Sequence, residues 1–512
     1  MAYRTNVYVL DNKSLLQIFS HYRLEEEDNW NLRLSWRRLA HVCRRWRLLI
    51  FDSSSHLDIR LCLTNDSPSL ELLSHLLLPL AIDYSDGTGT MARKDEDNLQ
   101  LGLRQQGQWL RRVTLRAPSS SFHAWLKLMN KLFPRLEDLY LLCTTTDELS
   151  LVLPETFQAP GLRHLTLHDI GLPNGFPLLS STIALSTLSL THIRDPSYLS
   201  PDHLVTLLQY LPYLEELSIG FNISVPLPSS EGELLLAPTL HVTPPTLRLR
   251  RLTFRGVDAY LDNLVAQINT PLLEQLNLTL LFDLTFNLVN LAQFLHRAEG
   301  LRCHVARVIF NKDGVAIDAS SYEQHGIGNL HIHIYCKPLD WQIDSATQVY
   351  SALGNVLSAV KELTLDLNED GMPSDWENTL DNILWIELLL LFTGMRKLHI
   401  GFSLILEVSR ALGSVAGEFV LEFLPELQEL GVQFEINHAI KLFHLFVEAR
   451  ESVGRPVQLL ALPILYPLAE SRIFPKYMDY DASSIPVHYS IITYLTRCAN
   501  INIAPGPLAT NI

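Results

Sequence analysis

A six-residue phrase, Leu-x-x-Leu-x-Leu, recurs eleven times along the 512 residues of this chain, with Val, Ile, Met or Phe sometimes replacing a leucine. The copies begin at Leu110, Leu136, Leu162, Leu185, Leu214, Leu249, Leu273, Val305, Val360, Met395 and Leu427. The end of each copy alternates between apolar and variable positions, which predicts a short strand with one buried face. No single copy can bury that face alone, so neighbouring copies are expected to stack around a shared core.

Helices are expected between these strands. After Ser200 and Pro201, a typical cap and first-turn proline, Leu204, Leu207 and Leu208 fall on one helical face. Five copies of the phrase also have a proline two residues ahead, which would end the preceding helix. Strands that alternate with helices predict an α/β fold with parallel pairing and right-handed crossovers between residues 57 and 435.

The phrase, with its first eight copies 23 to 35 residues apart, resembles the leucine-rich repeat. The resemblance implies a solenoid over residues 51–465, with parallel strands inside and helices outside. The solenoid should be irregular, because the asparagine that this family places after the last leucine is mostly missing. Pro118, Ile170 and Val257 occupy that position in some copies, whereas Asn222 and Asn368 match it.

The first 50 residues carry a different, helical pattern. Leu15, Ile18 and Phe19 are spaced i, i+3 and i+4, and Val42 and Trp46 lie along a second predicted helix. A helical unit of about 45 residues buries little apolar surface by itself and usually leans on a neighbour or a partner.

Leu10, the following Leu-Leu-x-Ile-Phe and the later Val-Cys-x-x-Trp-Arg resemble an F-box over residues 7–50, although Asp11 replaces the usual proline. F-boxes dock Skp-family adaptors in substrate receptors of cullin–RING ubiquitin ligases. The overall layout resembles the F-box-like leucine-repeat proteins of mushroom-forming fungi. The alternative is a helical cap on the stack, which needs only an amphipathic stripe. By the resemblance, adaptor docking would fall to Leu10, Leu15, Ile18, Phe19, Val42 and Trp46.

Composition narrows the class of partner and the compartment. A net charge of −15 argues against a general binder of nucleic acid or anionic membranes. Six scattered cysteines and the lack of a secretory signal favour a reducing compartment, the cytoplasm or the nucleus. The longest apolar stretch, Ile383–Phe392, is too short to span a bilayer.

Other segments are expected to join, interrupt or close the stack. Alternation over Leu57–Leu63 and Leu80–Tyr84 predicts two degenerate strands. Residues 466–512 are expected to form a C-terminal cap and tail, with a closing helix at Tyr489–Cys498. Polar composition predicts exposed loops at Asp86–Asn98, Lys312–Asn329 and Asn368–Asn378.

No spacing in the chain matches an established catalytic, nucleotide or metal motif, so we expect no enzymatic activity, metal or cofactor. His331, His333 and Cys336 have metal-ligand side chains, but strand alternation sends Cys336 to the opposite face. The two histidines are interpreted as ordinary strand residues. An enzyme of unfamiliar type is the least favoured reading.

The strand positions that flank the buried leucines predict the solvent-facing surface. This surface is expected to be basic early, and acidic late at Glu362, Asp366, Glu429 and Gln433. Arginine pairs bidentately with carboxylate or phosphate, so the hypothesis is a target protein with an acidic or phosphorylated segment. The chain would then be a non-catalytic substrate receptor; a scaffold without ligase association is the alternative. The early positions are Arg112, Arg116, Tyr140, His164, His168, Arg251 and Arg255.

Overall fold

A computed structural model gives an α/β protein whose chain divides into two compact units, Met1–Leu240 and His241–Ile512. Each unit is described by itself. The described residues are 10–24, 35–53, 57, 61–65, 70, 78–86, 92–145, 151–173, 177–194, 197–222, 246–281, 286, 288–298, 300–301, 303–321, 329–368, 382–415, 422–433 and 437–462.

The first unit begins with three helices, α1 (Asn12–Leu24), α2 (Ser35–Val42) and α3 (Arg44–Asp52). Cys43 separates α2 from α3: its backbone is extended, and its sulfur accepts a hydrogen bond from the Trp46 backbone N–H at 3.4 Å. The single second helix predicted from the sequence is therefore two helices, because the cysteine acts as an N-cap for α3. Val42 and Trp46 consequently lie on different helices.

The sheet of the first unit is parallel throughout, and its strands are adjacent in chain order. Both predicted degenerate strands are present, as β1 and β2. The strands are β1 (Leu61–Thr64), β2 (Leu80–Ser85), β3 (Leu110–Ala117), β4 (Asp138–Cys143), β6 (His164–His168), β8 (Thr187–Ile193) and β9 (Glu216–Phe221). A separate two-stranded sheet pairs β5 (Leu151–Val152) with β7 (Ile170–Gly171).

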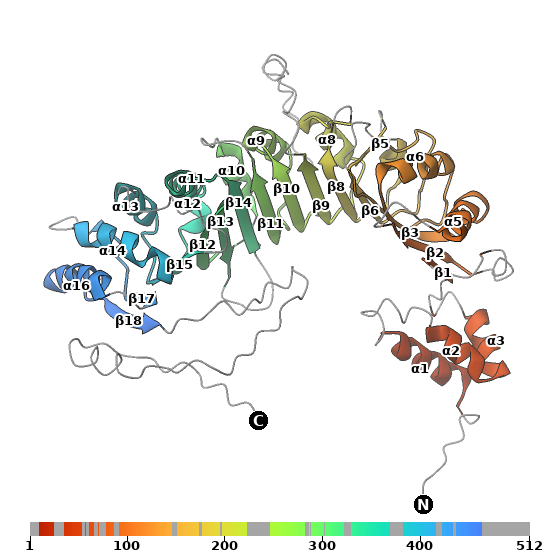
Figure 1. Ribbon diagram of the computed structural model, residues 1–512, viewed down its shortest axis with the longest axis horizontal. Helices are drawn as coiled ribbons and strands as arrows, with labels where there is room; N and C mark the ends of the chain where they lie inside the picture. The colour runs from red at the N-terminus through yellow and green to blue at the C-terminus, as the bar shows by residue number, and fades with distance from the viewer. Residues whose placement is uncertain are drawn as a thin grey trace, which may run out of the picture. The chain divides into compact units, whose positions relative to one another are not determined.

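One face of this sheet is the core. Leu165 and Leu217, the second leucines of the copies that begin at Leu162 and Leu214, are buried, as are their counterparts in the neighbouring strands. The helices between the strands (Figure 1) supply the other half of the core. Trp125 and Leu204 are among their buried residues. They are α5 (Arg93–Gln105), α6 (Ser119–Leu128), α7 (Pro177–Ser181) and α8 (Pro201–Leu208). Ser200 caps α8 as predicted, accepting a hydrogen bond from the His203 N–H.

The second unit has a mixed sheet whose order is β10-β11-β14-β13-β12-β15-β16-β17-β18. Its strands are β10 (Arg251–Gly256), β11 (Gln275–Leu280), β12 (Val305–Asn311), β13 (Gly314–Ser320), β14 (Asn329–Tyr335), β15 (Glu362–Leu367), β16 (Lys397–Ile400), β17 (Glu429–Gln433) and β18 (Gln458–Leu462). Its helices are α9 (Asp258–Ala266), α10 (Val289–Arg297), α11 (Leu339–Ala352), α12 (Gly354–Leu357), α13 (Asn382–Leu390), α14 (Ile405–Ser414) and α16 (Asn437–Ser452), with a 3₁₀ turn at Phe402–Leu404.

The prediction of uniform parallel pairing is wrong at β13, which runs antiparallel to both β12 and β14. The predicted loop Lys312–Asn329 contains this strand. The side-chain oxygen of Asn311 accepts hydrogen bonds from the backbone N–H groups of Asp313 and Gly314, both at 3.0 Å, and closes a tight turn. A Cβ on Gly314 would lie 1.9 Å from the Ile334 carbonyl oxygen, so only glycine fits there.

The predicted loop Asp86–Asn98 is also partly wrong, because α5 begins at Arg93. Asp95 and Asn98 are buried, and the Asn98 side chain accepts a hydrogen bond from the Leu70 N–H at 2.8 Å. Asn98, one of the polar residues that suggested a loop, serves instead as an internal partner for a backbone group. Residues 466–512 and Tyr489–Cys498 lie outside the described residues, as does most of Asn368–Asn378.

Candidate protein-binding surfaces

The six residues predicted to dock an adaptor divide between the core and the surface of the helical module. Leu15 and Phe19 are 0% and 2% exposed, and Trp46 packs edge-on against Phe19 with ring centroids 4.9 Å apart. Leu10, Ile18 and Val42 are 36%, 46% and 60% exposed. Trp46 is half-buried, so the exposed group and part of Trp46 are accessible to a partner without opening the module.

Sequence reasoning missed Leu48, which is 53% exposed on α3. The Arg45 guanidinium fixes the chain before α1 against α3, donating to the Leu10 carbonyl at 2.7 Å and to the Asn12 side chain at 2.9 Å. Arg45 lies three residues from both Val42 and Leu48 in the sequence. The i, i+3 spacing of Arg45 and Leu48 on α3 could have indicated that the two share a face.

Asp11, which stands where an F-box usually has proline, acts as a helix cap. Its carboxylate accepts a hydrogen bond from the Ser14 backbone N–H at 2.7 Å, one turn into α1. This hydrogen bond lowers the pKa of Asp11. The Asp11 side chain therefore caps the start of α1.

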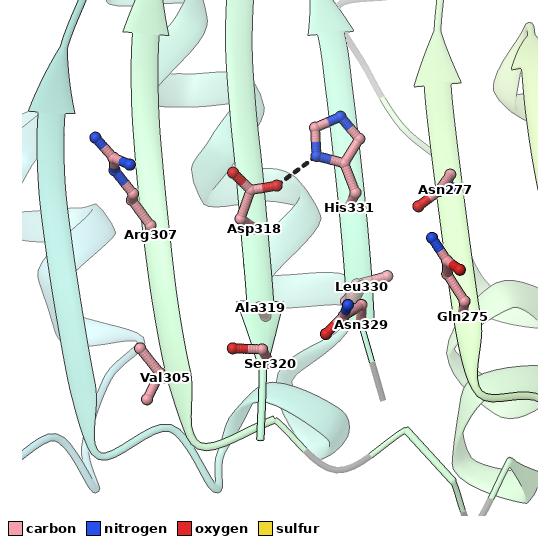
Figure 2. A pocket seen from close by; sticks show the side chains of 10 residues that line it. All are labelled: Gln275, Asn277, Val305, Arg307, Asp318, Ala319, Ser320, Asn329, Leu330 and His331. Atoms are coloured by element: carbon pink, nitrogen blue, oxygen red, sulfur yellow. Dashed lines mark hydrogen bonds and ion pairs between the residues drawn. The ribbon is translucent and has the colours of Figure 1, made fainter. Parts of the chain in front are cut away.

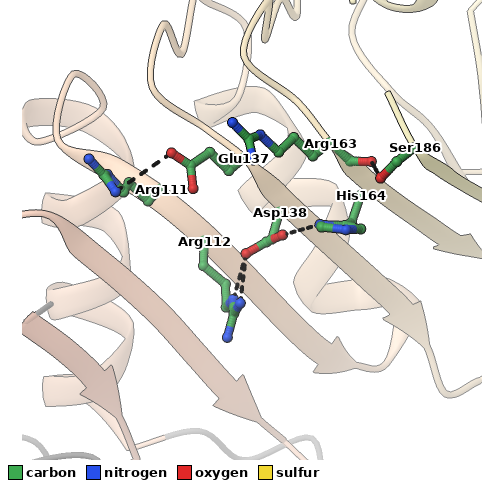
Figure 3. Close-up of polar contacts among 7 residues, drawn as sticks. All are labelled: Arg111, Arg112, Glu137, Asp138, Arg163, His164 and Ser186. Carbon is green, nitrogen blue, oxygen red and sulfur yellow. Dashed lines mark hydrogen bonds and ion pairs between the residues drawn. The ribbon is translucent and has the colours of Figure 1, made fainter. Parts of the chain in front are cut away.

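On the exposed face of the first sheet, Asp138 lies between two predicted target-binding residues (Figure 3). Arg112 donates to one carboxylate oxygen at 2.8 Å, and the Nδ1–H of His164 donates to the other at 2.5 Å. Partial burial alone would raise the pKa of Asp138, but the hydrogen bonds from His164 and Arg112 bring it below its ordinary value. Arg112 is therefore already paired.

The remaining early residues make local contacts on the same face. The Arg116 guanidinium lies 5.3 Å from the ring centroid of Tyr140, a cation–π distance. The Nδ1 of His168 lies 2.9 Å from the Thr191 hydroxyl. Arg111, next to Arg112, forms an ion pair with Glu137 at 3.6 Å (Figure 3). The strand alternation that selected Arg112 also selects Asp138, so the sequence could have revealed this acid.

Arg251 and Arg255 belong to the second unit, so the predicted early residues are shared between the two units. Arg251 is exposed on β10. Arg255 is half-buried, with its guanidinium 5.9 Å from the Tyr335 ring centroid. His333 lies nearby, and burial of its own imidazole ring lowers its pKa. The charges of His331 and Arg255 act in the same direction.

The late residues, predicted to form an acidic surface, are largely neutralised. Asp366 forms an ion pair with Arg307, and Glu429 forms one with Lys397 at 3.3 Å. The side chain of Gln433 lies outside the described residues. Asp366 and Glu429 are thus each balanced by a cation on a neighbouring strand, whereas Glu362 forms no ion pair with another described residue.

Over the centre of the second sheet lies an open hollow of about 350 Å³, lined from β11, β12, β13 and β14. The Nδ1–H of His331 donates to Asp318 within it, and Arg307 lies on the far side of Asp318 (Figure 2). Asparagine, glutamine and serine side chains make up much of the remaining wall. This hollow lies where β13 interrupts the parallel pairing.

Within the described residues, no group of three His, Cys, Asp or Glu side chains is placed to hold a metal ion. Cys336 and Cys303 are buried, and burial raises the pKa of the Cys303 thiol to about 11. None of the helices in the described part has the length and apolar composition that a bilayer crossing requires.

Comparison with known proteins adds no relative. A scan against protein-family models finds no match to this chain. A search of curated proteins also finds no match.

Proposed function

We propose that the chain is a non-catalytic substrate receptor of an SCF-type cullin–RING ubiquitin ligase. In this proposal α1–α3 dock a Skp-family adaptor, which links the chain to a cullin, and the leucine-rich sheets hold a target protein. The observation that carries the proposal is the exposure of Leu10, Ile18, Val42 and Leu48 on a helical module whose described residues form only a small core.

Exposed apolar side chains on a small module favour a protein partner for a physical reason. Leu15, Phe19, Ala40 and Ile50 are the buried apolar residues within the described parts of α1–α3. Covering four further apolar side chains by a partner would remove them from water at about 25 cal/mol per Å². In this proposal the four side chains share one docking surface, since contiguous exposed apolar patches mark interaction sites.

The sheets support the second half of the proposal. Each presents a row of polar side chains on the face opposite the core, and several of these side chains are already paired across strands. A broad surface of this type is suited to a protein rather than a small molecule.

The test is recovery of a Skp-family adaptor and cullin with the full chain. Ile18→Asp combined with Val42→Asp places two charges in the docking surface, and we expect adaptor recovery to fall at least about tenfold. Gln17→Asp is the matched control, because Gln17 is an exposed polar residue on the same helix. Leu15→Asp is unsuitable, because Leu15 is buried and its loss would unfold the module.

Equal recovery of the adaptor by wild type and a folded double variant would contradict the proposal. The helices would then be a cap, and the chain a leucine-rich scaffold. Thermal unfolding of each variant establishes that the module remains folded.

A further inference from the structure

The hollow on the second sheet holds three side-chain amides with free hydrogen-bonding capacity. Gln275, Asn277 and Asn329 line it, and no described residue pairs with their amide groups. Each amide offers two N–H donors and a carbonyl acceptor. As far as the described residues are concerned, these donors and acceptors are left to solvent or to a ligand.

Strand register places these amides in two adjacent rows. Gln275 is opposite Asn329, which is opposite Ser320 across the antiparallel pair. Asn277 is opposite His331 in the next row. The two rows therefore present closely spaced donors and acceptors over three neighbouring strands, as Figure 2 shows.

The charges in the hollow are balanced and do not favour an anion. Arg307 is paired with Asp366, and Asp318 is held by His331. Arg307 and Asp318 are opposite each other in register and form no ion pair with each other. The Arg307 guanidinium, a donor, and the Asp318 carboxylate, an acceptor, thus lie side by side. A peptide unit carries both an N–H donor and a carbonyl acceptor and can therefore pair with both side chains.

We propose that this hollow binds an extended, uncharged polypeptide segment through the peptide groups of that segment. The inference rests on the proposed function only in identifying the bound protein as a ligase target. The acidic or phosphorylated ligand expected from the sequence is not the class that these side chains select.

The size of the hollow agrees with a short extended segment. Four strands spaced about 4.8 Å apart span about 14 Å, which about four extended residues cover at roughly 3.3 Å each. Its volume of about 350 Å³ lies within the range of pockets that hold compact ligands. Additional residues would continue over the flanking strands.

The test uses the full chain and a phage-displayed library of random dodecapeptides. A selected peptide is synthesised with fluorescein, and its affinity is measured by fluorescence anisotropy. The triple variant Gln275→Ala, Asn277→Ala and Asn329→Ala should weaken binding at least about tenfold. The matched control is Gln458→Ala, since Gln458 is exposed on the same face at β18 and should leave the affinity within about twofold.

A second probe tests recognition of the backbone. The same peptide with two adjacent backbone nitrogens methylated should also bind at least about tenfold more weakly, because it lacks those N–H donors. If the triple variant is not folded by thermal unfolding, Asn277→Ala alone is measured, with an expected loss of about threefold to tenfold.

Three outcomes would overturn the inference: no peptide selected by the folded chain, unchanged affinity in the folded amide variant, or acidic peptides that depend on Arg307 but not on the amides. Adaptor recovery is measured on the same preparations. A wild-type chain that binds the peptide but recovers no adaptor would contradict the proposed function alone. The reverse result would remove only this inference.

Discussion

The two sheets differ in one element, and that element changes the surface each presents. In the first unit β3, β4, β6, β8 and β9 follow one another in chain order, all in parallel. In the second unit the three strands β12, β13 and β14 lie in the sheet in the reverse of their chain order. As a result β14, rather than β12, pairs with β11. The regular sheet carries a row in which Asp138 pairs with Arg112 and His164, whereas the interrupted sheet carries a hollow whose amides pair with no described residue.

The repeat phrase therefore predicts which face of a strand is buried far better than it predicts which strand lies beside it. The buried side of β13 has the same apolar alternation as the leucine phrases, with Val315, Ile317 and Ala319 buried. Its direction is set by the turn at Asn311 and Gly314, which lies outside the apolar pattern. A regular core can therefore continue beneath an irregular surface.

The largest expected effect tests whether the meander is as integral to its core as a regular strand. Leu217→Ala in β9 and Ile317→Ala in β13 should each lower the free energy of unfolding by about 2–5 kcal/mol. Denaturant unfolding measures both, with Ser218→Ala on the open face of β9 as a control below about 1 kcal/mol. A small effect at Ile317 alone would break the comparison, because β13 would then be a surface addition.

The next effect concerns the turn that reverses β13. Gly314→Ala should cost about 1–3 kcal/mol, because its Cβ would meet the Ile334 carbonyl oxygen. Gly354→Ala is the matched control: no atom lies within 4 Å of its Cβ position, and it should be neutral or slightly stabilising. Thermal unfolding of the two variants compares them, and equal stability would argue against the tight approach of β13 and β14.

The free energy of unfolding should depend on pH through His333, which lies in the sheet of the second unit. Burial lowers the folded pKa of His333, so stability from its neutral form is fully present above the unfolded pKa of about 6.5. That stability is lost as the pH falls toward the folded pKa. His333→Gln should flatten the decline between about pH 7 and 5. The exposed His296→Gln should leave the decline unchanged, and identical profiles for both variants would contradict the assignment.

The smallest effect lies in the first unit. Because the folded pKa of Asp138 is lowered, its contribution is present above the unfolded pKa of about 3.9 and is lost as the pH falls through the folded value. Asp138→Asn should cost about 1 kcal/mol or less at neutral pH and remove this acid-sensitive component. Unfolding at pH 7 and pH 3 measures it, with Glu137→Gln as control; a pH-independent difference would mean that the carboxylate charge is not involved.

Local periodicity was enough to predict the α/β class, the buried leucines of most strands and the helix after Ser200. It also gave the correct buried faces, because alternation and helical spacing depend only on neighbours in sequence. The same patterns identified the apolar residues of α1, but not which of them would be exposed. Leu15 and Ile18 look equivalent in the sequence, and only the packing of α1 against α2 and α3 separates them.

The sequence by itself therefore determined which residues must leave water and in what kind of element. The tertiary structure alone decided strand order, the reversal of β13 and the pairing of charges across strands. Arg450 illustrates the reason: it is buried on α16 and donates to the carbonyls of Phe423 and Leu427 at 3.2 and 3.3 Å. These carbonyls lie more than 20 residues away in the sequence. Burial of a polar group costs free energy unless it forms hydrogen bonds, and only the tertiary structure decides whether such distant partners come within hydrogen-bonding distance.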